Sequence, residues 1–341
     1  MHDASDSPRV GSTGRPASTA GESERPVALT VTPNPSLDLL FDAERLVWDD
    51  ANRLPMPRRR PGGQGVNVVR AIRALGGRAV AVAPLGGETG RELRSLLDAE
   101  GTPLRAVPST GETRVFVAVR ERESGRSLLL NPRGTTVESG LTDELLAATG
   151  AALERRRPGW VAGCGSLPPG VGHHFYVEAG RLARRCGARW VPDCDGPALR
   201  AAADAGCDLL VPNVHEAGRL LGRPIEDLRG AAAAARALLE YGPPVACVTM
   251  GEGGAVAADA TSGVVWHAVA AGDRPDGCAV GAGDAFLGAL LLALDAHSPA
   301  PDALRRAVAA GTAVLYGEGD SLVDAATVAR IESTVTVRRV T

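Results

Sequence analysis

Val280-Gly281-Ala282-Gly283-Asp284 opens a run of apolar residues that extends from Ala285 to Leu294. Two glycines let the backbone turn tightly, and the run from Ala282 to Leu294 predicts a buried helix. The first amide groups of a helix have no partner within it, so they point out of its N-terminus and favour an anion there. We therefore expect an anion-binding site at the start of this helix.

Asp284 falls in the first turn of the predicted helix, one residue beyond the amide donors. A carboxylate at that position is favoured by the helix dipole and faces whatever the amides bind. An anion site beside a base is typical of phosphoryl transfer to a hydroxyl, because the amides stabilise the moving phosphoryl group while the base accepts the proton. A plain turn followed by a capping carboxylate has the same pattern. Other motifs must decide between the two.

The composition is that of an ordinary globular protein, with 341 residues, 44% apolar residues and 23% charged ones. This length allows one large domain or two. A net charge of -3 gives no sign of a nucleic-acid or membrane partner. All 37 basic residues are arginine, which excludes Schiff-base catalysis by lysine and the Gly-Lys-Ser/Thr loop of P-loop enzymes.

The first 26 residues are rich in Ser, Gly, Asp, Pro and Arg, and they lack the apolar stretch of a signal peptide. We expect residues 1–26 to form a disordered tail and residues 27–341 to fold. The six cysteines form no Cys-x-x-Cys pair, so reduced thiols and a cytoplasmic location are expected. No apolar run reaches the roughly 20 residues that span a bilayer.

Two motifs near the start of the chain carry candidate sugar ligands. The strand predicted for Val27 to Val31 ends in Thr32-Pro33-Asn34-Pro35-Ser36-Leu37-Asp38. The Asp38 carboxylate could accept hydrogen bonds from two sugar hydroxyls, or it could simply hold an Asx-turn. Pro61-Gly62-Gly63-Gln64-Gly65-Val66-Asn67 then leads into a predicted helix, and its three glycines suit either close approach of a ligand or a flexible turn.

A predicted hairpin interrupts the alternation of helices and strands. Thr113 to Arg120 and Ser127 to Asn131 are typical strands, joined across Glu123-Ser124-Gly125-Arg126. We expect this hairpin to pair with the early strands as a lid, formed by about residues 36–60 and 111–132. Arg114 lies near the base of the lid, where a guanidinium could bind an anion through two hydrogen bonds or simply be exposed.

The alternation elsewhere predicts an α/β fold with a mostly parallel sheet and helices on both faces. A strand at residues 79–84 precedes a helix that we expect to open with the capping box Thr89-Gly90-Arg91-Glu92. The remaining predicted helices cover residues 142–154, 173–186, 197–205 and 225–241, and the remaining strands cover residues 160–162, 189–192, 209–211 and 245–249.

Three loops follow predicted strand ends in this half. Gly163 to Gly170 offers the Ser166 hydroxyl among free backbone donors. Pro212-Asn213-Val214-His215-Glu216 places an amide and a carboxylate three residues apart, which suits either a water-bridged Mg²⁺ or a helix cap. Thr249-Met250-Gly251-Glu252-Gly253-Gly254 could hold a nucleotide phosphate or turn the chain.

Taken in order, these motifs resemble those of the ribokinase-like (PfkB) carbohydrate kinases. The set comprises Pro-Ser-Leu-Asp, Pro-Gly-Gly-x-Gly-x-Asn, Thr-Arg, Gly-Ser-Leu-Pro-Pro-Gly, Asn-x-x-Glu, Thr-x-Gly-x-x-Gly and Val-Gly-Ala-Gly-Asp. The resemblance covers roughly residue 27 to the C-terminus, and it implies a three-layer α/β/α fold with a small β-lid that often forms a dimer interface. Thr-Arg and Gly-Ser-Leu-Pro-Pro-Gly are similar to the phosphofructokinase and tagatose-6-phosphate kinase branch.

The resemblance also implies roles for individual residues. Asp284 would be the catalytic base, beside an anion hole formed by the amides of Gly281, Ala282 and Gly283. The ligands of the sugar hydroxyls would be Asp38, Gly62, Gly63 and Asn67, and those of the substrate phosphate would be Arg114, Ser166 and Arg53. ATP and Mg²⁺ would be bound by Asn213, Glu216, Thr249, Gly251 and Gly254, with Glu216 at the metal and the adenine near Ala309 to Ala313.

The chain departs from the family pattern at two positions. Many relatives have lysine where Gln64 stands, although the minor 6-phosphofructokinases have glycine there, and many have lysine where Val211 stands. The motif from Pro61 to Gly77 is most similar to the minor 6-phosphofructokinase type. The resemblance thus implies ATP-dependent phosphorylation of fructose 6-phosphate to the 1,6-bisphosphate. Fructose 1-phosphate or tagatose 6-phosphate is the nearest alternative, and an unphosphorylated sugar or nucleoside is a wider one.

Two other classes of protein are less consistent with the sequence. A nicotinamide-binding oxidoreductase would have a third glycine where Phe286 stands. A non-catalytic sugar-binding regulator would have no use for Asp284, which is intact together with both flanking glycines.

Overall fold

The computed structural model describes residues 25–138, 140–272, 277–317 and 322–340. The tail expected at residues 1–26 therefore lies outside the described residues, except for its last two positions. Among the helices of the described ranges, none has the length and apolarity that crossing a bilayer requires.

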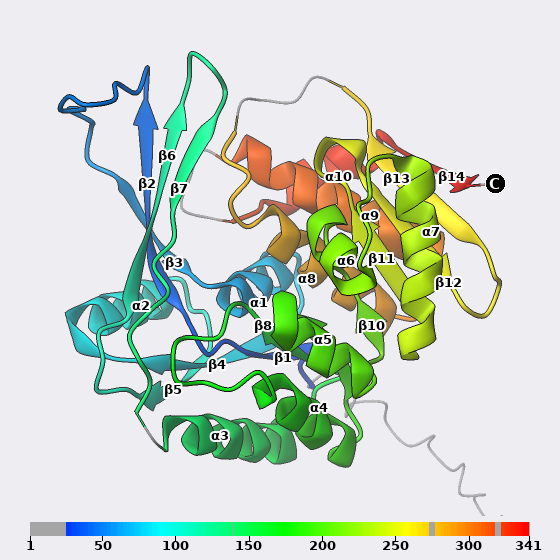
Figure 1. Cartoon of the computed structure of the whole chain (residues 1–341), viewed down its shortest axis with the longest axis horizontal. Coiled ribbons are helices and arrows are strands. Elements are labelled where there is room, and N and C mark those ends of the chain that lie inside the picture. Colours follow the sequence, from blue (N-terminus) through cyan, green and yellow to red (C-terminus); the bar gives the residue numbers. More distant parts are fainter. Residues whose placement is uncertain (1–24, 139, 273–276, 318–321, 341) are drawn as a thin grey trace, which may run out of the picture.

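A parallel sheet of five strands forms the centre of the molecule (Figure 1). Its strand order is β5-β4-β1-β8-β9, and every neighbouring pair is parallel. The strands are β1 (Ala28–Val31), β4 (Ala79–Leu85), β5 (Leu104–Pro108), β8 (Trp160–Cys164) and β9 (Arg189–Asp193). This confirms the expected parallel core, because a helix lies between each of these strands and the next one along the chain and returns the chain to the same end.

A second five-stranded sheet continues the layer beyond β9, where the Asp208 amide donates to the Trp190 carbonyl oxygen at 2.8 Å. Its first pair is parallel and the other three pairs are antiparallel. In order, the strands are β10 (Leu209–Leu210), β11 (Val245–Thr249), β12 (Ala255–Asp259), β13 (Val265–Ala270) and β14 (Val335–Val340). No strand was expected after Thr249. The antiparallel part was missed because short turns, rather than helices, join β11, β12 and β13.

Helices cover both faces of this layer (Figure 1). One face carries α1 (Gln64–Ala74), α2 (Gly87–Ala99), α8 (Ala282–Asp295), α9 (Ala300–Ala313) and α10 (Ala325–Glu332). The other carries α3 (Leu141–Arg156), α4 (Phe175–Arg185), α5 (Gly196–Asp204), α6 (Val214–Leu221) and α7 (Leu228–Leu238). Short 3₁₀ turns lie at η2 (Leu239–Tyr241), η3 (Gly251–Gly253) and η4 (Val314–Tyr316).

Alternation along β1 shows how the sequence fills two cores. Ala28 packs with the helices of the first face, whereas Leu29 and Val31 pack with those of the second. This two-residue period is that of a strand buried on both sides. The β1 residues therefore contribute to both cores of the three-layer α/β/α fold.

The start of α2 differs from the expectation. The helix begins at Gly87, and its N-cap is Gly86 rather than Thr89. Glu92 does not complete a capping box, because its carboxylate accepts two hydrogen bonds from the Arg59 guanidinium. The charged guanidinium of Arg59 is a stronger hydrogen-bond partner for the Glu92 carboxylate than an uncharged backbone amide is.

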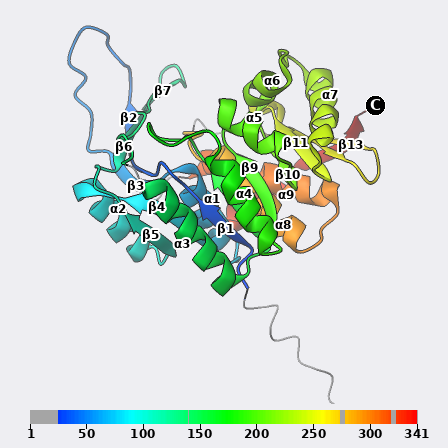
Figure 2. The same ribbon diagram turned by 60° about the horizontal axis from the view of Figure 1, so that its bottom comes forward.

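A third, four-stranded sheet stands beside the α/β body, as Figure 2 shows. Its order is β3 (Arg58–Gly62), β2 (Ser36–Ala43), β6 (Arg114–Glu121) and β7 (Ser127–Leu130). Its last two strands form the hairpin that the sequence predicted, and β2 pairs with β6 in parallel.

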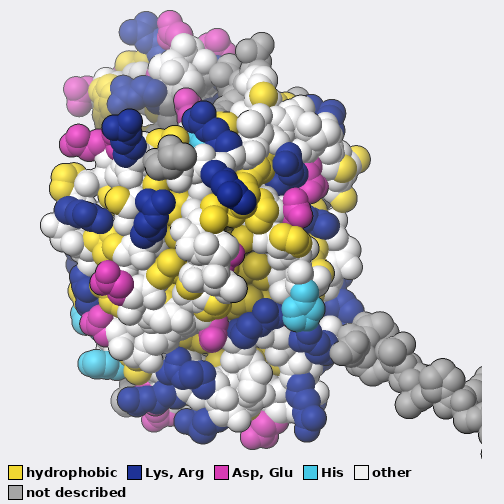
Figure 3. All heavy atoms as spheres, turned by 90° about the vertical axis from the view of Figure 1, so that its right-hand side faces the viewer, with side chains coloured by type: hydrophobic (Ala, Val, Ile, Leu, Met, Phe, Trp, Pro, Cys, Tyr) yellow, Lys and Arg dark blue, Asp and Glu magenta, His cyan; other side chains and the backbone are white. Residues whose placement is uncertain are grey.

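The face of the molecule in Figure 3 shows basic side chains spread among acidic ones, rather than gathered into one basic patch.

The packing of β8 predicts a sharp effect of one added methyl group. A Cβ on Gly163 would lie 2.4 Å from Trp190 Cη2 and 2.5 Å from Tyr176 Cδ1, both in buried rings. We expect Gly163→Ala to lower the free energy of unfolding by roughly 1–3 kcal/mol, measured by urea denaturation. Gly172→Ala is the matched control, since no atom lies within 4 Å of its added Cβ. Equal stability of the two variants would contradict this packing.

Candidate active site

The start of α8 has the geometry expected of an anion site. Gly281 is the N-cap residue with φ 91°, a conformation that favours glycine. No atom lies within 4 Å of a Cβ built on Gly283, so open space adjoins this turn. The Ala282 amide donates to the Ala279 carbonyl oxygen at 3.0 Å, whereas no backbone hydrogen bond within the described ranges uses the amides of Gly281 or Gly283. Two of the three predicted donors therefore remain available to a ligand.

Asp284 lies in the first turn of α8 and is only 7% exposed. Burial raises the pKa of its carboxyl to about 7, and the negative charge of Asp38 contributes in the same direction. The Asn67 side-chain amide opposes this shift by donating to Asp284 Oδ2 at 2.9 Å. A carboxyl group with a pKa near 7 is well suited to accept a proton at neutral pH.

Asn67 is held in place from its other side. Its carbonyl oxygen accepts a hydrogen bond of 3.3 Å from Arg70, whose guanidinium also makes two hydrogen bonds of 2.8 Å to the Glu100 carboxylate. These contacts orient the Asn67 amide so that its NH₂ group faces Asp284. Helix α1 therefore supplies a fixed donor to the Asp284 carboxylate on α8.

Asp38 lies on β2, and burial raises the pKa of its carboxyl to about 6. A 2.6 Å hydrogen bond from the Ser36 hydroxyl and the charge of Arg114 both oppose that shift. The glycine loop makes room for this carboxylate, because a Cβ on Gly62 would lie 2.0 Å from Asp38 Oδ1. Gly63 has φ 98°, and its Cβ would lie 2.9 Å from Pro35 Cα. The structure thus requires both glycines for close packing.

Arg114 and Ser166 meet through Asn34, which the sequence analysis did not select. The Arg114 guanidinium donates to the Asn34 carbonyl oxygen at 3.2 Å and 3.1 Å, and it also contacts Asn131. The Asn34 side-chain amide donates to Ser166 Oγ at 3.1 Å. Burial lowers the pKa of Arg114. Arg114 and Ser166, the proposed phosphate ligands, are therefore neighbours. Asn34, a single asparagine between two prolines, gave no signal in the sequence that it would link them.

Arg53 is not brought to this network. It lies in the exposed loop between β2 and β3, at the upper left of Figure 1. Its side chain is exposed, whereas Arg114 and Ser166 are joined through Asn34. Its role as a phosphate ligand stays a prediction.

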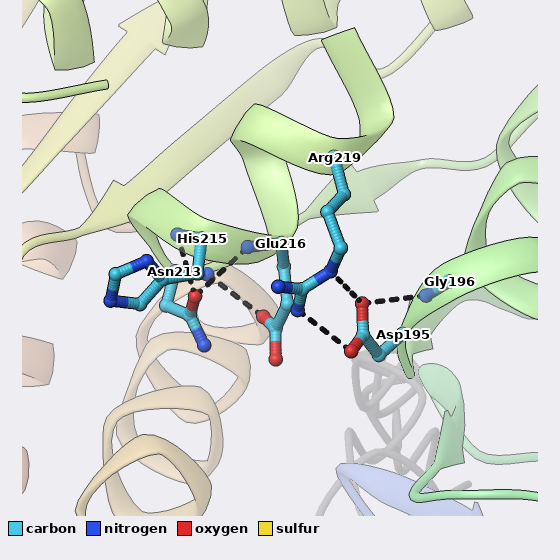
Figure 4. Close-up of polar contacts among 6 residues, drawn as sticks. All are labelled: Asp195, Gly196, Asn213, His215, Glu216 and Arg219. Carbon is cyan, nitrogen blue, oxygen red and sulfur yellow. Dashed lines mark hydrogen bonds and ion pairs between the residues drawn. The ribbon is translucent and has the colours of Figure 1, made fainter. Parts of the chain in front are cut away.

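The Asn213 motif forms a capping box at the start of α6 (Figure 4). Asn213 Oδ1 accepts from the amides of His215 and Glu216 at 2.9 Å and 3.0 Å, and Glu216 Oε2 accepts from the Asn213 amide at 2.9 Å. Burial raises the pKa of Glu216. Arg219 lies beside it in an ion pair of 2.7 Å with Asp195. The capping function that the spacing allowed is therefore present, and one oxygen of Glu216 is left for another ligand.

The third strand-end loop lies next to Asn213, since Thr249 and Asn213 form an isolated parallel bridge. Gly251 has φ 55°, with no atom within 4 Å of a Cβ built on it. Gly254 has φ 80°, and a Cβ there would lie 2.0 Å from the Ala268 carbonyl oxygen. This loop is therefore tightly turned at Gly254 and open at Gly251.

Asp193 is a further carboxylate of the site that the sequence analysis missed. It ends β9, one residue beyond the predicted strand, and burial raises the pKa of its carboxyl well above the ordinary range. Asp284 and Glu216 lie close enough to raise it further. Its position at the carboxyl end of a parallel strand was the available signal. Within the described ranges, no cluster of three or more His, Cys, Asp or Glu residues could hold a metal.

Comparison with known proteins settles the family. The profile described as pfkB family carbohydrate kinase matches residues 32–325. The chain belongs to the pfkB family of carbohydrate kinases. It is similar to a 1-phosphofructokinase of Rhodobacter capsulatus, with 33% identity over 91% of this chain and 96% of that protein. It is also similar to an ATP-dependent 6-phosphofructokinase isozyme 2 of Mycobacterium tuberculosis, with 31% identity over 88% of this chain and 87% of that protein.

Solved structures of pfkB kinases agree with the fold. Phosphofructokinase-2 from Escherichia coli in complex with fructose-6-phosphate is 30% identical, with a TM-score of 0.80 over 90% of this chain and 98% of that one. A tetrameric inhibited form of the same enzyme gives the same score. The expected ribokinase-like fold, family and kinase activity are thereby confirmed. The chain is a phosphofructokinase-type sugar phosphate kinase, in a family whose sugar kinases use ATP.

The protonation of Asp284 predicts the pH dependence of the reaction. Only the ionised carboxylate can accept a proton, so kcat/KM should rise with pH through about 7. Asn67→Leu removes the hydrogen bond that favours the ionised form, so the midpoint should move to higher pH. Rates measured from pH 5.5 to 9 test both expectations. An unshifted midpoint in a folded Asn67→Leu variant would contradict the role of this contact.

Proposed function

We propose that this pfkB kinase transfers the γ-phosphoryl group of ATP to fructose 6-phosphate and forms fructose 1,6-bisphosphate. The observation that carries the proposal is the position of Asp38 on β2. Its neighbour Ser36 is opposite Arg114 on β6, and the charge of Asp38 is near enough to Asp284 to raise the pKa of that carboxyl. A sugar held by Asp38 would have one end at a base and the other near a cation. A sugar that already bears a phosphate matches this arrangement.

Fructose 1-phosphate is the second candidate substrate, because the Rhodobacter capsulatus relative is named 1-phosphofructokinase. Both reactions give the same bisphosphate, and they differ in which end of the sugar faces the base. The segment from Pro61 to Gly77 favours fructose 6-phosphate by its similarity to the minor 6-phosphofructokinases. Tagatose 6-phosphate would bind with the same orientation as fructose 6-phosphate.

The proposed mechanism uses a small number of groups. Asp284 accepts the proton of the sugar hydroxyl, whose oxygen forms a bond to the γ-phosphorus while the bond to the leaving ADP oxygen breaks. The amides of Gly281 and Gly283 stabilise the charge on the phosphoryl oxygens. Asp38 accepts hydrogen bonds from sugar hydroxyls, and Asn67 keeps the base ionised and oriented. Arg114 and Ser166 hold the phosphate that the substrate already carries.

Residues at the other strand ends fit ATP and Mg²⁺. Mg²⁺ usually keeps several waters and binds one or two carboxylates together with phosphates. Glu216 has one carboxylate oxygen that the capping box does not use. Asp193 is near both Glu216 and Asp284, since each of these two charges raises the pKa of its carboxyl. When bound, the ion would neutralise charge on the phosphates. Asn213, Thr249, Gly251 and Gly254 would contact the nucleotide, whose adenine would lie near Ala309.

The small sheet supports the proposal of a lid and a homodimer. Its exposed large apolar side chains lie on the β2–β3 loop and on β7, and they are Val47, Trp48, Met56, Leu129 and Leu130. Large exposed apolar side chains on one small sheet favour an interface there. A tetrameric form of the Escherichia coli enzyme shows that this kind of kinase can assemble.

Loss of the base should abolish turnover while leaving the fold intact. We expect Asp284→Asn to lower kcat by roughly a thousandfold or more, with little change in sugar affinity. Asp302→Asn, in the exposed first turn of α9, is the matched control and should keep full activity. Turnover of Asp284→Asn within tenfold of the wild type would rule out the proposed base.

A panel of acceptors tests the substrate. ADP release should be selective for one hexose phosphate among fructose 6-phosphate, fructose 1-phosphate, tagatose 6-phosphate, fructose, ribose and adenosine. Arg114→Met should then raise KM for that phosphosugar by roughly tenfold or more, because it removes a charge-assisted contact to a phosphate. Selective turnover of an unphosphorylated acceptor would refute the phosphosugar assignment.

A further inference from the structure

Arg60 is a buried cation that the proposed mechanism does not use. It lies on β3 and is 6% exposed. Among the described residues its guanidinium has no hydrogen-bond or ion-pair partner, and its Nε is fully buried. Burial lowers the pKa of Arg60, and the neighbouring charge of Arg70 contributes in the same direction, whereas the charge of Asp38 opposes the shift. Leaving an arginine buried without a partner is costly, which indicates that a ligand completes the site.

The strand register places Arg60 directly beside the sugar-binding carboxylate. Asp38 on β2 is opposite Arg60 on the antiparallel strand β3, so the two side chains lie on the same face of the small sheet. Ser36 is opposite Arg114 on β6, and residues 36 and 38 also share a face. Arg60 and Arg114 therefore flank Asp38 from its two neighbouring strands, about 10 Å apart from strand to strand.

The two arginines are oriented toward different ends of the site. Arg114 contacts Asn34, which in turn bonds to Ser166. Arg60 instead lies on β3, the strand that leads through Gly63 into α1, whose Asn67 donates a hydrogen bond of 2.9 Å to Asp284 beside the anion site. One cation is thus on the side of Ser166, and the other is on the side where phosphoryl transfer is proposed to occur.

We propose that Arg60 binds the phosphoryl group that the reaction adds, so that Arg114 and Arg60 together hold the two phosphates of a sugar bisphosphate. This inference rests on the proposed function, and it holds for either fructose phosphate as substrate. Its chemistry is charge stabilisation: as the oxygen–phosphorus bond to the sugar forms, negative charge arrives beside the guanidinium. Asp38 is a negative charge near Arg60, but among the described residues it makes no hydrogen bond or ion pair with the guanidinium. The ligand supplies that direct contact.

Binding measurements on arginine variants test this assignment. Titration calorimetry with fructose 1,6-bisphosphate and fructose 6-phosphate would compare the wild type with Arg60→Met and Arg114→Met. We expect Arg60→Met to weaken the bisphosphate by roughly tenfold or more while leaving the monophosphate nearly unchanged, because only the added phosphate meets Arg60. Arg114→Met should weaken both ligands. Arg59→Met is the matched control, since Arg59 lies on the opposite face of β3 and pairs with Glu92.

Thermal stability separates ligand binding from a structural role. Removing an unpartnered buried charge should leave the free Arg60→Met variant as stable as the wild type, or more stable. A structural role would lower its melting temperature instead. If Arg60→Met failed to fold, the expectation that its stability is unchanged would be wrong. Arg60→Lys would then decide whether Arg60 binds the phosphate, because lysine keeps the charge but cannot make a bidentate contact. Arg60→Lys should bind the bisphosphate more weakly than the wild type does, with the monophosphate unchanged.

The outcomes distinguish this inference from the proposed function. A wild type that phosphorylates no phosphosugar would refute the proposed function itself. A wild type that is active, with an Arg60→Met variant that binds both ligands as the wild type does, would overturn only the role of Arg60. Equal weakening of both ligands by Arg60→Met would also overturn it, since it would place Arg60 in the general sugar site.

Discussion

The site depends on two buried carboxylates held close to each other. Asp38 comes from the small sheet and Asp284 from the first turn of α8, and burial raises the pKa of both. Each charge makes the other harder to form, so the fold must supply donors and cations around them. Asn67 and Ser36 supply the hydrogen bonds, and the arginines of β3 and β6 supply positive charge. Most of the surrounding structure serves this requirement.

The same arrangement explains the glycines around the site. Gly62 has no side chain because the Asp38 carboxylate fills the space that a Cβ would occupy, and Gly281 takes a left-handed conformation that starts α8. These positions serve packing as well as access for a ligand.

An ionised Asp284 also costs stability: because its folded-state pKa lies above 3.8, unfolding becomes easier as the pH rises from about 4 to 7. The catalytic arrangement is therefore maintained against its own electrostatic cost.

Local motifs carried much of the architecture. The alternation of apolar segments indicated the parallel sheet, and the hairpin of β6 and β7 was predicted from turn residues between two strand-like runs. The capping box at Asn213 was visible as a three-residue spacing. Antiparallel strands β12, β13 and β14 were missed, because short alanine-rich or charged strands have weak periodicity. Glu92 was misassigned because its partner Arg59 is 33 residues away.

Short motifs in the sequence were enough to predict the fold class and the family, and they selected Asp284 as the proposed base. Which residues lie together in one site became clear only from the folded chain. It brought Asn34 between Arg114 and Ser166, added Asp193 at the end of β9, and left Arg53 in an exposed loop. Strand register placed Arg60 beside Asp38. Such contacts join distant parts of the chain, and their burial depends on the packing of whole layers, so no local pattern can report them.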